Sequence, residues 1–376
     1  MPSTKYDVAV AGAGIVGLAH AWLAARKGLR VAVFEKDSRC TGASIRNFGF
    51  ITVTGQRAGD TWRRARRSRD LWAEVAPHAG IPLCHEGLVV VGQRDEALEM
   101  LEAFHHTEMG EACELLHIDA LHARFPEVRR ELALGGLYSP HELRVESKDA
   151  IGLLTKWLRQ EMKVDFFFDH ELLEFNLPQL RTARGVFQAE RLILCPGNAL
   201  SGVAAPYLSP HRLTHTQLQM LRIQPRHRLV LNAAVMSDLS LVRYAGYTGM
   251  NCHARLLERI KREEPACLEA GIHLIVVQSQ DGSLVVGDSH HPAREVEPFA
   301  DESVDRLILQ QLTQTLRLNE FEITHRWTGK YPVGDADTDA LILSPDPNLR
   351  VVSVISGTGA STAFGLAEEV IHQWGI

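Results

Sequence analysis

The feature that most restricts the fold of this chain is the segment GAGIVG at residues 12–17, a Gly-x-Gly-x-x-Gly motif. A short apolar run at Tyr6–Ala11 precedes it and predicts a strand, and the alanine-rich Ile15–Arg26 predicts a helix. The run RVAVFE at Arg30–Glu35 predicts a second strand. Together these elements form a βαβ unit whose first turn carries the glycines, which predicts a Rossmann domain that binds a dinucleotide.

Each glycine of the motif has a separate role in such a unit. Gly12 permits the tight turn, Gly14 lets the backbone approach a pyrophosphate, and Gly17 allows the helix to pack closely on the strand. The phosphates are expected at the N-terminus of the helix, near Ile15 and Val16, because free N–H groups and the helix dipole favour anions there. The motif therefore predicts the place of the pyrophosphate.

Glu35 indicates which dinucleotide is bound. It ends the second strand and follows Gly17 by 18 residues, close to the spacing of roughly 20 expected for an acid that binds ribose hydroxyls. A carboxylate there disfavours a 2′-phosphate, so NAD or FAD is expected rather than NADP. Lys36 directly follows and is a further candidate for cofactor binding.

The rest of the chain predicts a discontinuous arrangement of two domains. Helical patterns occur at Ala97–Phe104 and Asp149–Leu158, and short strands return between 166 and 198. HLIVVQSQDGSLVVGD at His273–Asp288 predicts a hairpin that turns at Asp281-Gly282. The last 27 or so residues predict a strand, a glycine-rich turn and a helix. We predict a nucleotide domain from 1–80, 145–210 and 325–376, and a second domain from 81–144 and 211–324.

Three further segments carry a likeness to a known family. GASIRNFG at 42–49 follows the second strand, CPGN at 195–198 ends a middle strand, and SGTGAST at 356–362 precedes the final helix. With the 12–17 motif, these segments resemble the D-amino-acid-oxidase-like superfamily of FAD-dependent oxidoreductases, which includes glycine and sarcosine oxidases. The segments at 218–222, 277–291, 326–332 and 357–369 are similar to a bacterial branch linked to the degradation of aminophosphonates.

The resemblance implies which residues hold the flavin. In the family, the segment after the second strand runs beside the pyrophosphate, the ribityl chain and the ring, and the last glycine turn directs N–H groups at the pyrimidine. A helix N-terminus there would stabilise negative charge on a reduced flavin. Besides the residues above, the implied cofactor contacts are Ser44, Arg46, Asn47, Gly49, Leu172, Gly197, Gly357, Thr358, Gly359, Ala360, Ser361 and Thr362.

The resemblance also implies the fold and the reaction. We expect an α/β protein with a glutathione-reductase-like FAD-binding Rossmann domain and a second, α+β substrate domain built on a mainly antiparallel sheet. The expected reaction is hydride transfer from a carbon bearing an amine to flavin N5, followed by hydrolysis of the imine. The stretch 326–331 lacks the cysteine that tethers the flavin in monomeric sarcosine oxidases. FAD is therefore expected to bind without a covalent link.

An anionic amine needs cations in its pocket, and the planar fork of Arg suits a carboxylate or phosphonate. The candidates for anion binding are Arg46, Arg222, Arg243, Arg326 and Lys330, with His290 and Tyr331 as hydrogen-bonding partners. Among all of these, the residues that we predict to be catalytic are Arg46, Asn47, His290, Lys330 and Tyr331.

Composition restricts partners and location. The chain has 40 basic and 46 acidic residues, which argues against binding of nucleic acid through bulk charge. Six scattered cysteines, no apolar run long enough to cross a membrane and an N-terminus that moves straight into a strand are typical of a cytoplasmic enzyme. The His105-His106 and His290-His291 pairs lack ligand spacing, so no metal is expected.

Two other functions stay open on the sequence alone. An NAD-dependent dehydrogenase would share residues 6–35, and a non-catalytic flavin-binding subunit of a larger complex would share the flavin motifs. The sequence does not choose between oxygen and a quinone or other carrier as the electron acceptor. It also does not identify the amine.

Overall fold

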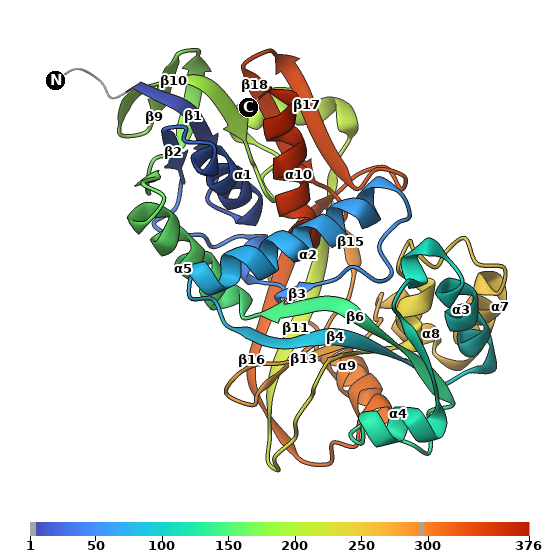
Figure 1. Ribbon diagram of the computed structural model, residues 1–376. Helices are drawn as coiled ribbons and strands as arrows, with labels where there is room; N and C mark the ends of the chain where they lie inside the picture. The colour runs from blue at the N-terminus through green and yellow to red at the C-terminus, as the bar shows by residue number, and fades with distance from the viewer. Residues whose placement is uncertain (1–4, 294–296, 376) are drawn as a thin grey trace.

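Two β-sheets divide the chain into two lobes, which lie one above the other in the computed structural model (Figure 1). The structure describes residues 5–293 and 297–375. The upper lobe in Figure 1 contains both ends of the described chain, and the lower lobe contains most of residues 83–145 and 214–333. This arrangement, with helices and strands in both lobes, is the α/β fold expected from the sequence.

The sheet of the upper lobe has a parallel centre, in the order β18-β10-β1-β2-β7. β17 is added antiparallel beside β18, and β9 and β8 continue antiparallel from β10. These strands are β1 (Lys5–Ala11), β2 (Val31–Phe34), β7 (Asp165–Phe167), β8 (Leu172–Asn176), β9 (Gln179–Thr182), β10 (Gly185–Leu194), β17 (Ala340–Asp346) and β18 (Leu349–Val354).

Both faces of this parallel centre are buried, as the near-continuous apolar sequences of its strands require. Val8 and Val10 of β1 pack on one face against α1 (Ile15–Arg26), α2 (Asp60–His78), α5 (Ser147–Gln160) and α10 (Gly359–Gln373). Ala9 packs in a second apolar layer, which also includes Tyr6 at the start of β1 and Leu208 of α6 (Ala205–Leu208). The predicted strand–helix–strand unit at the N-terminus is confirmed, with the helix bounds as expected.

Helix α2 carries the basic cluster at 62–69 and holds α10 in place. Arg64 donates to Glu369 at 2.7 Å and Arg67 to Glu368 at 2.7 Å. The indole N–H of Trp72 donates to the carbonyl oxygen of Ala360 at 3.0 Å, in the first turn of α10. These contacts orient the N-terminus of α10.

The sheet of the lower lobe is mainly antiparallel, and β12 and β4 form a parallel pair within it. Its strands are β3 (Phe50–Ile51), β4 (Leu83–Gly92), β5 (Glu114–His117), β6 (Gly135–Val145), β11 (Thr214–Pro225), β12 (Ala234–Ser237), β13 (Ile275–Gln278), β14 (Leu284–Gly287), β15 (His291–Ala293) and β16 (Phe321–Val333). Its helices are α3 (Asp95–His105), α4 (Ile118–Arg124), α7 (His253–Glu263), α8 (Pro265–Glu269) and α9 (Glu302–Thr315), with the short 3₁₀ turns η1 (Ala43–Ile45), η2 (Glu108–Gly110), η3 (Gly202–Ala204), η4 (Ser209–His211) and η5 (Asp238–Val242) elsewhere in the chain.

The predicted boundary at residue 325 divides a strand. β16 begins at Phe321 and pairs with β11 from Phe321 to Val333, so residues 325–333 belong to the sheet of the lower lobe. β3 at 50–51 also joins that sheet, through β6. A long strand that extends from one lobe towards the other cannot be divided from its sequence alone, because its alternation of side chains continues across the boundary.

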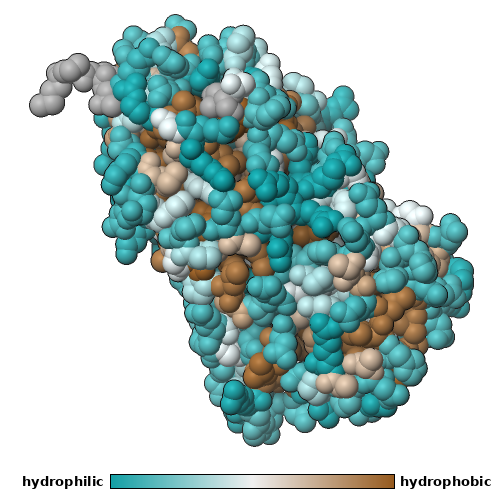
Figure 2. All heavy atoms as spheres, viewed as in Figure 1, coloured by the Kyte–Doolittle hydropathy of each residue, from teal (hydrophilic) through white to brown (hydrophobic). Residues whose placement is uncertain are grey.

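The surface on the face shown in Figure 2 is mostly hydrophilic, with apolar side chains in separate small patches. Within residues 5–293 and 297–375, none of the helices has both the length and the apolar character needed to cross a membrane.

Candidate functional site

The glycine turn at 12–17 has the geometry that its sequence predicts. Gly12 has φ +113°, and a Cβ on it would lie 2.3 Å from the carbonyl oxygen of Cys195. A Cβ on Gly17 would lie 1.9 Å from the carbonyl oxygen of Gly12. Larger residues at these two positions would separate β1, β10 and α1. The sequence therefore specifies both the turn and the close approach of helix to strand.

Two side chains from other segments form hydrogen bonds with the backbone of this turn. The carboxylate of Glu35 accepts from the N–H of Ala13 at 2.9 Å, and the hydroxyl of Ser44 accepts from the N–H of Ile15 at 2.9 Å. Glu35 is 9% exposed and follows β2, as expected for an acid beside the turn. Lys36 is exposed. Ser44 thus connects the predicted flavin loop with the N-terminus of α1.

The loop that follows β2 is closed by Asn47. Its side-chain amide donates to the carbonyl oxygens of Ala43 and Ser44, at 2.9 and 3.1 Å, and its Oδ1 accepts from the N–H of Gly49 at 2.7 Å. Gly49 has φ +66°, and a Cβ there would lie 1.9 Å from the carbonyl oxygen of Val145. Both residues therefore shape the loop, and the catalytic role expected for Asn47 stays a prediction.

Arg46 attaches the same loop to the lower lobe. Its Nε donates to the carbonyl oxygen of Thr41 at 2.9 Å and one terminal nitrogen to that of Thr328, in β16, at 3.2 Å. The carbonyl oxygen of Arg46 accepts from the indole of Trp327 at 3.1 Å. Part of the guanidinium is thus occupied by the backbone, although Arg46 lines the cavity described next.

One cavity of about 790 Å³ joins these segments. It extends from the first turn of α1 along the 43–48 loop and past Gly197 to the first turn of α10, and it is also lined by strands of the lower lobe. Two helix N-termini therefore face one cavity, and each offers N–H groups and a favourable dipole to an anion or a polarised oxygen. Of the predicted cofactor contacts, the following line it: Ile15, Val16, Ser44, Arg46, Asn47, Gly197, Gly357, Thr358, Gly359, Ala360 and Ser361.

The other predicted cofactor contacts lie outside the lining of this cavity. They are Gly12, Gly14, Gly17, Glu35, Lys36, Gly49, Leu172 and Thr362. Leu172 is 6% exposed and packs in the apolar layer beneath the upper sheet, because β8 folds onto that layer. The hydroxyl of Thr362 donates to the carbonyl oxygen of Thr358 at 3.0 Å, within α10.

The glycine turn before α10 packs directly against Tyr331. Gly357 has φ +77°, and a Cβ there would lie 2.9 Å from the Tyr331 ring. The hydroxyls of Ser356 and Thr358 lie 2.9 Å apart, and that of Ser361 accepts from the N–H of Thr52 at 2.9 Å. A glycine is needed here for both the backbone conformation and the ring beside it.

At the lower-lobe end, the cavity has a polar wall. Arg243, Tyr244, His273, Asp288, His290, Lys330 and Tyr331 all line it. A terminal nitrogen of Arg243 donates to the hydroxyl of Tyr331 at 3.4 Å. Burial raises the pKa of Tyr331 to about 12 and that of Asp288 to about 7, although Arg243 lowers both. Burial lowers the pKa of His273 to about 3 and that of His290 well below its usual value.

Two of the predicted cations are elsewhere. Arg222 is 8% exposed and donates to Glu146 at 2.9 Å and to the hydroxyls of Ser279 and Ser283. Arg326 donates to Asp305 at 2.8 Å, and it is absent from the lining of the cavity. Both had been predicted as candidates for the substrate anion. Their charges are already paired with carboxylates, so Arg46, Arg243 and Lys330 remain.

His273 and Asp288 are not among the site residues predicted from the sequence. A signal for them was present, because the predicted hairpin brings its two ends together. Ile275 pairs with Gly287 in the β13–β14 hairpin, so His273, just before the first strand, and Asp288, just after the second, must meet. The Nε2 of His273 lies 3.3 Å from Oδ1 of Asp288, and the Nε2 of His290 lies 3.8 Å from Oδ2. Ligand atoms of these three residues lie within 4.8 Å of one another, which would suit a metal ion.

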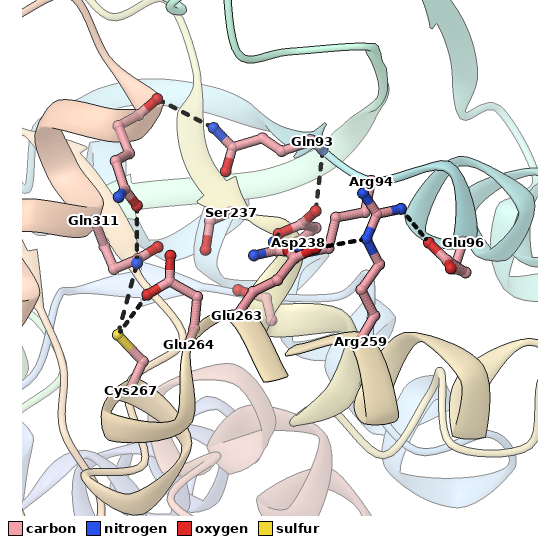
Figure 3. Close-up of polar contacts among 12 residues, drawn as sticks. Gln93, Arg94, Glu96, Ser237, Asp238, Arg259, Glu263, Glu264, Cys267 and Gln311 are labelled. Atoms are coloured by element: carbon pink, nitrogen blue, oxygen red, sulfur yellow. Dashed lines mark hydrogen bonds and ion pairs between the residues drawn. The ribbon is translucent and has the colours of Figure 1, made fainter. Parts of the chain in front are cut away.

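A buried ionic network supports the segment that carries Arg243 (Figure 3). Asp238, which begins η5, is fully buried and accepts from Arg94 at 2.7 Å and from the N–H of Gln93 at 3.0 Å. Arg94 also donates to Glu263 of α7 at 2.7 Å. Because η5 ends immediately before Arg243, this network holds the backbone from which the side chain of Arg243 extends.

Comparisons with known proteins agree with this geometry. Residues 7–373 match the model of the family described as FAD dependent oxidoreductase. The chain is 24% identical to a glycine oxidase of Geobacillus kaustophilus (strain HTA426) over 208 residues, which are 51% of this chain and 55% of that enzyme. The match therefore spans about half the length of that relative.

Solved structures share the fold over nearly the whole chain. The crystal structure of the glycine oxidase from Geobacillus kaustophilus matches with a TM-score of 0.77 at 18% identity, covering 99% of this chain and 95% of that one. L-proline dehydrogenase from P. horikoshii matches with a TM-score of 0.76 at 18% identity, covering 98% and 92%. At these identities the likeness establishes the architecture.

Proposed function

Because this chain belongs to the FAD dependent oxidoreductase family, we propose that it oxidises the C–N bond of a small amine or amino-acid-like substrate that carries an anionic group. An aminophosphonate is the specific substrate that we propose. The observation that carries the proposal is the single cavity that connects two helix N-termini with a wall bearing Arg243, Lys330 and Asp288. A cofactor and a charged amine can share that space.

The residues present fit FAD. The glycines at 12 and 17 permit the close approach of β10 and α1 to the turn, which places the N-terminus of α1 at the cavity, and the α10 turn lines the same cavity as the 43–48 loop. We propose that Ser44, Gly197, Gly357, Thr358 and Gly359 contact it. The residues that line the described part of the cavity include no cysteine, which supports non-covalent binding. When bound, FAD supplies the two-electron acceptor for a hydride leaving the carbon beside nitrogen.

The protein's own residues would bind and orient the substrate. Arg243 offers a planar fork that can form charge-assisted hydrogen bonds with a carboxylate or phosphonate. The hydroxyl of Tyr331 accepts a hydrogen bond from one terminal nitrogen of Arg243. Lys330 would add a second positive charge from β16. Loss of the hydride converts the amine into an iminium ion, and water then hydrolyses this ion to a carbonyl compound and a smaller amine.

The names of similar proteins support an amine substrate of this kind. A glycine oxidase matches in sequence, and a glycine oxidase and an L-proline dehydrogenase match in structure. Family membership favours FAD over the NAD-dependent alternative. A non-catalytic flavin-binding subunit is the alternative that the experiment below must exclude. Oxygen and a quinone or other carrier are both compatible with the proposal as electron acceptors. A cytoplasmic location is also compatible with it, since all six cysteines are free thiols.

The test is the visible spectrum of the purified protein, followed by anaerobic titration with amines. The panel comprises N-methyl-2-aminoethylphosphonate, 2-aminoethylphosphonate, sarcosine, glycine, L-proline and the neutral control N-methylpropylamine. We expect a flavin spectrum that bleaches with at least one anionic amine and much more slowly with the neutral one. A colourless protein would contradict the cofactor assignment, and a yellow protein that no amine bleaches would favour the non-catalytic subunit.

A further inference from the structure

Asp288 and His290 form an acceptor pair in the wall of the cavity. Asp288 directly follows β14 and is 5% exposed, and His290 follows two residues later. Oδ1 of Asp288 is buried and makes no hydrogen bond in the described structure, although Nε2 of His273 lies 3.3 Å from it. An unpartnered carboxylate oxygen beside a cavity is costly unless a donor or a cation reaches it.

The tautomer of His290 follows from its other contact. Its Nδ1 lies 3.2 Å from the carbonyl oxygen of Gly271. A carbonyl oxygen can only accept, so Nδ1 carries the proton, and the neutral ring presents Nε2 as a lone pair. Burial keeps the ring neutral, because it holds the pKa of His290 well below the usual value. Nε2 faces Oδ2 of Asp288 across 3.8 Å.

When Asp288 is ionised, two acceptors therefore face each other with no proton between them. This arrangement favours a group that donates two hydrogen bonds and carries positive charge. An N–H donor lies about 2.9 Å from its acceptor, so one nitrogen can reach both atoms across the gap. The protonated form of a primary or secondary amine has the two N–H groups required.

We propose that Asp288 and His290 bind the ammonium group of the substrate and that Asp288 accepts its proton before oxidation. This inference rests on the proposed function. In the step, one N–H bond of the ammonium breaks and an O–H bond forms on Asp288. The nitrogen becomes neutral and keeps its electron pair, which then assists departure of the hydride from the neighbouring carbon. Electrons and protons balance without any further reactant.

The wall offers a cation one carboxylate, that of Asp288. Arg243 lies close enough to lower the pKa values of Asp288, His273 and His290, so its positive charge opposes the attraction of that carboxylate for any cation, and the metal content of the protein distinguishes an ammonium site from a metal site. A zwitterionic substrate would place its anion towards Arg243 and its ammonium towards Asp288. The same wall would thus recognise both ends of one small molecule.

The pH dependence of reduction distinguishes this role from a structural one. The groups that face Asp288 are Arg243 and Tyr244 after η5, His273 before β13, His290, and Tyr331 of β16. Neutral histidines leave Asp288 as the acceptor that titrates near neutral pH, since its pKa is raised to about 7. The carboxylate is present above that pH, so wild-type reduction should rise through about pH 7 and then level off.

The variant that tests the inference is Asp288→Asn, studied as the FAD-loaded protein by anaerobic stopped-flow reduction from pH 6 to 10. Reduction by the best anionic amine should fall roughly 100- to 10,000-fold at pH 7, the range for loss of general acid–base catalysis. The reduction rate of the Asp288→Asn variant should then rise with pH up to the pKa of the free amine, because only amine molecules that are already neutral would react. FAD released per protein should equal the wild-type value.

The matched control is Asp305→Asn, which removes a carboxylate that is also 5% exposed but pairs with Arg326 and Gln219. Its pH profile should keep the wild-type shape. His290→Gln is the second variant in the polar wall, for use if Asp288→Asn does not fold, and it should shift the pH profile in the same direction by a smaller amount. Metal content of the wild type is measured in parallel by mass spectrometry.

The outcomes separate the inference from the proposed function. If the wild type is reduced but Asp288→Asn or His290→Gln keeps its rate and profile, the inference is overturned and the proposed function stands. A stoichiometric metal that is lost from Asp288→Asn also overturns it, in favour of a metal site. If no amine reduces the wild type, the proposed function fails and the inference fails with it.

Discussion

Replacement of Arg243 by methionine tests the anion end of the cavity. Methionine keeps most of the length of the side chain and removes the charge and the fork. A hydrogen bond to a charged group contributes about 1.5–3 kcal/mol, and about 1.4 kcal/mol corresponds to tenfold in rate. We therefore expect kcat/KM for an anionic amine to fall by roughly 10- to 150-fold.

The same substitution should move a pKa in a known direction. Burial is the main cause of the raised pKa of Asp288, and Arg243 partly offsets it. Removal of Arg243 therefore raises the pKa of Asp288 above about 7. Because the reactive form is the carboxylate, the acid limb of the reduction rate should move to higher pH.

The assay is anaerobic reduction of the FAD-loaded protein by N-methyl-2-aminoethylphosphonate and by N-methylpropylamine, from pH 6 to 10. The neutral amine should lose much less than the anionic one, since it has no group to pair with Arg243. Arg46→Met is the comparison, because two of its nitrogens already bind the carbonyl oxygens of Thr41 and Thr328. Equal losses for both amines in Arg243→Met, or an unmoved acid limb, would refute this reasoning.

Three further predictions follow from the same structure. Acid precipitation should release all the yellow cofactor as FAD, since 326–332 contains no cysteine; colour left in the pellet would contradict this. Glu35→Ala should weaken FAD binding in equilibrium dialysis without changing the preference among amines, because Glu35 lies at the glycine turn and outside the cavity lining. Arg94→Ala leaves Asp238 buried and unpaired, so the free energy of unfolding should fall by about 3–5 kcal/mol in urea. The exposed pair of Arg255 and Glu99 provides its control, since Arg255→Ala should leave the free energy of unfolding nearly unchanged.

The local amino-acid sequence determined several structural elements of this protein. The turn at 12–17 could be predicted because Gly17 packs against the carbonyl oxygen of Gly12, five residues earlier, although the close neighbour of Gly12 itself is the distant Cys195. The same reasoning applies to α1 and to the β13–β14 hairpin, whose turn chemistry and alternation lie within a few residues. Such features depend on near neighbours, which the sequence displays directly.

Long-range pairing decided the rest. The sequence does not show that β16 joins the lower sheet or that Arg222 and Arg326 are already paired with carboxylates. Asp288 and Arg243 belong to separate segments, and only the folded chain places both on one wall. The free energy of each charge depends on burial and on its nearest partners. Those are properties of the tertiary structure, so the chemistry of this wall could be assigned only once the fold was known.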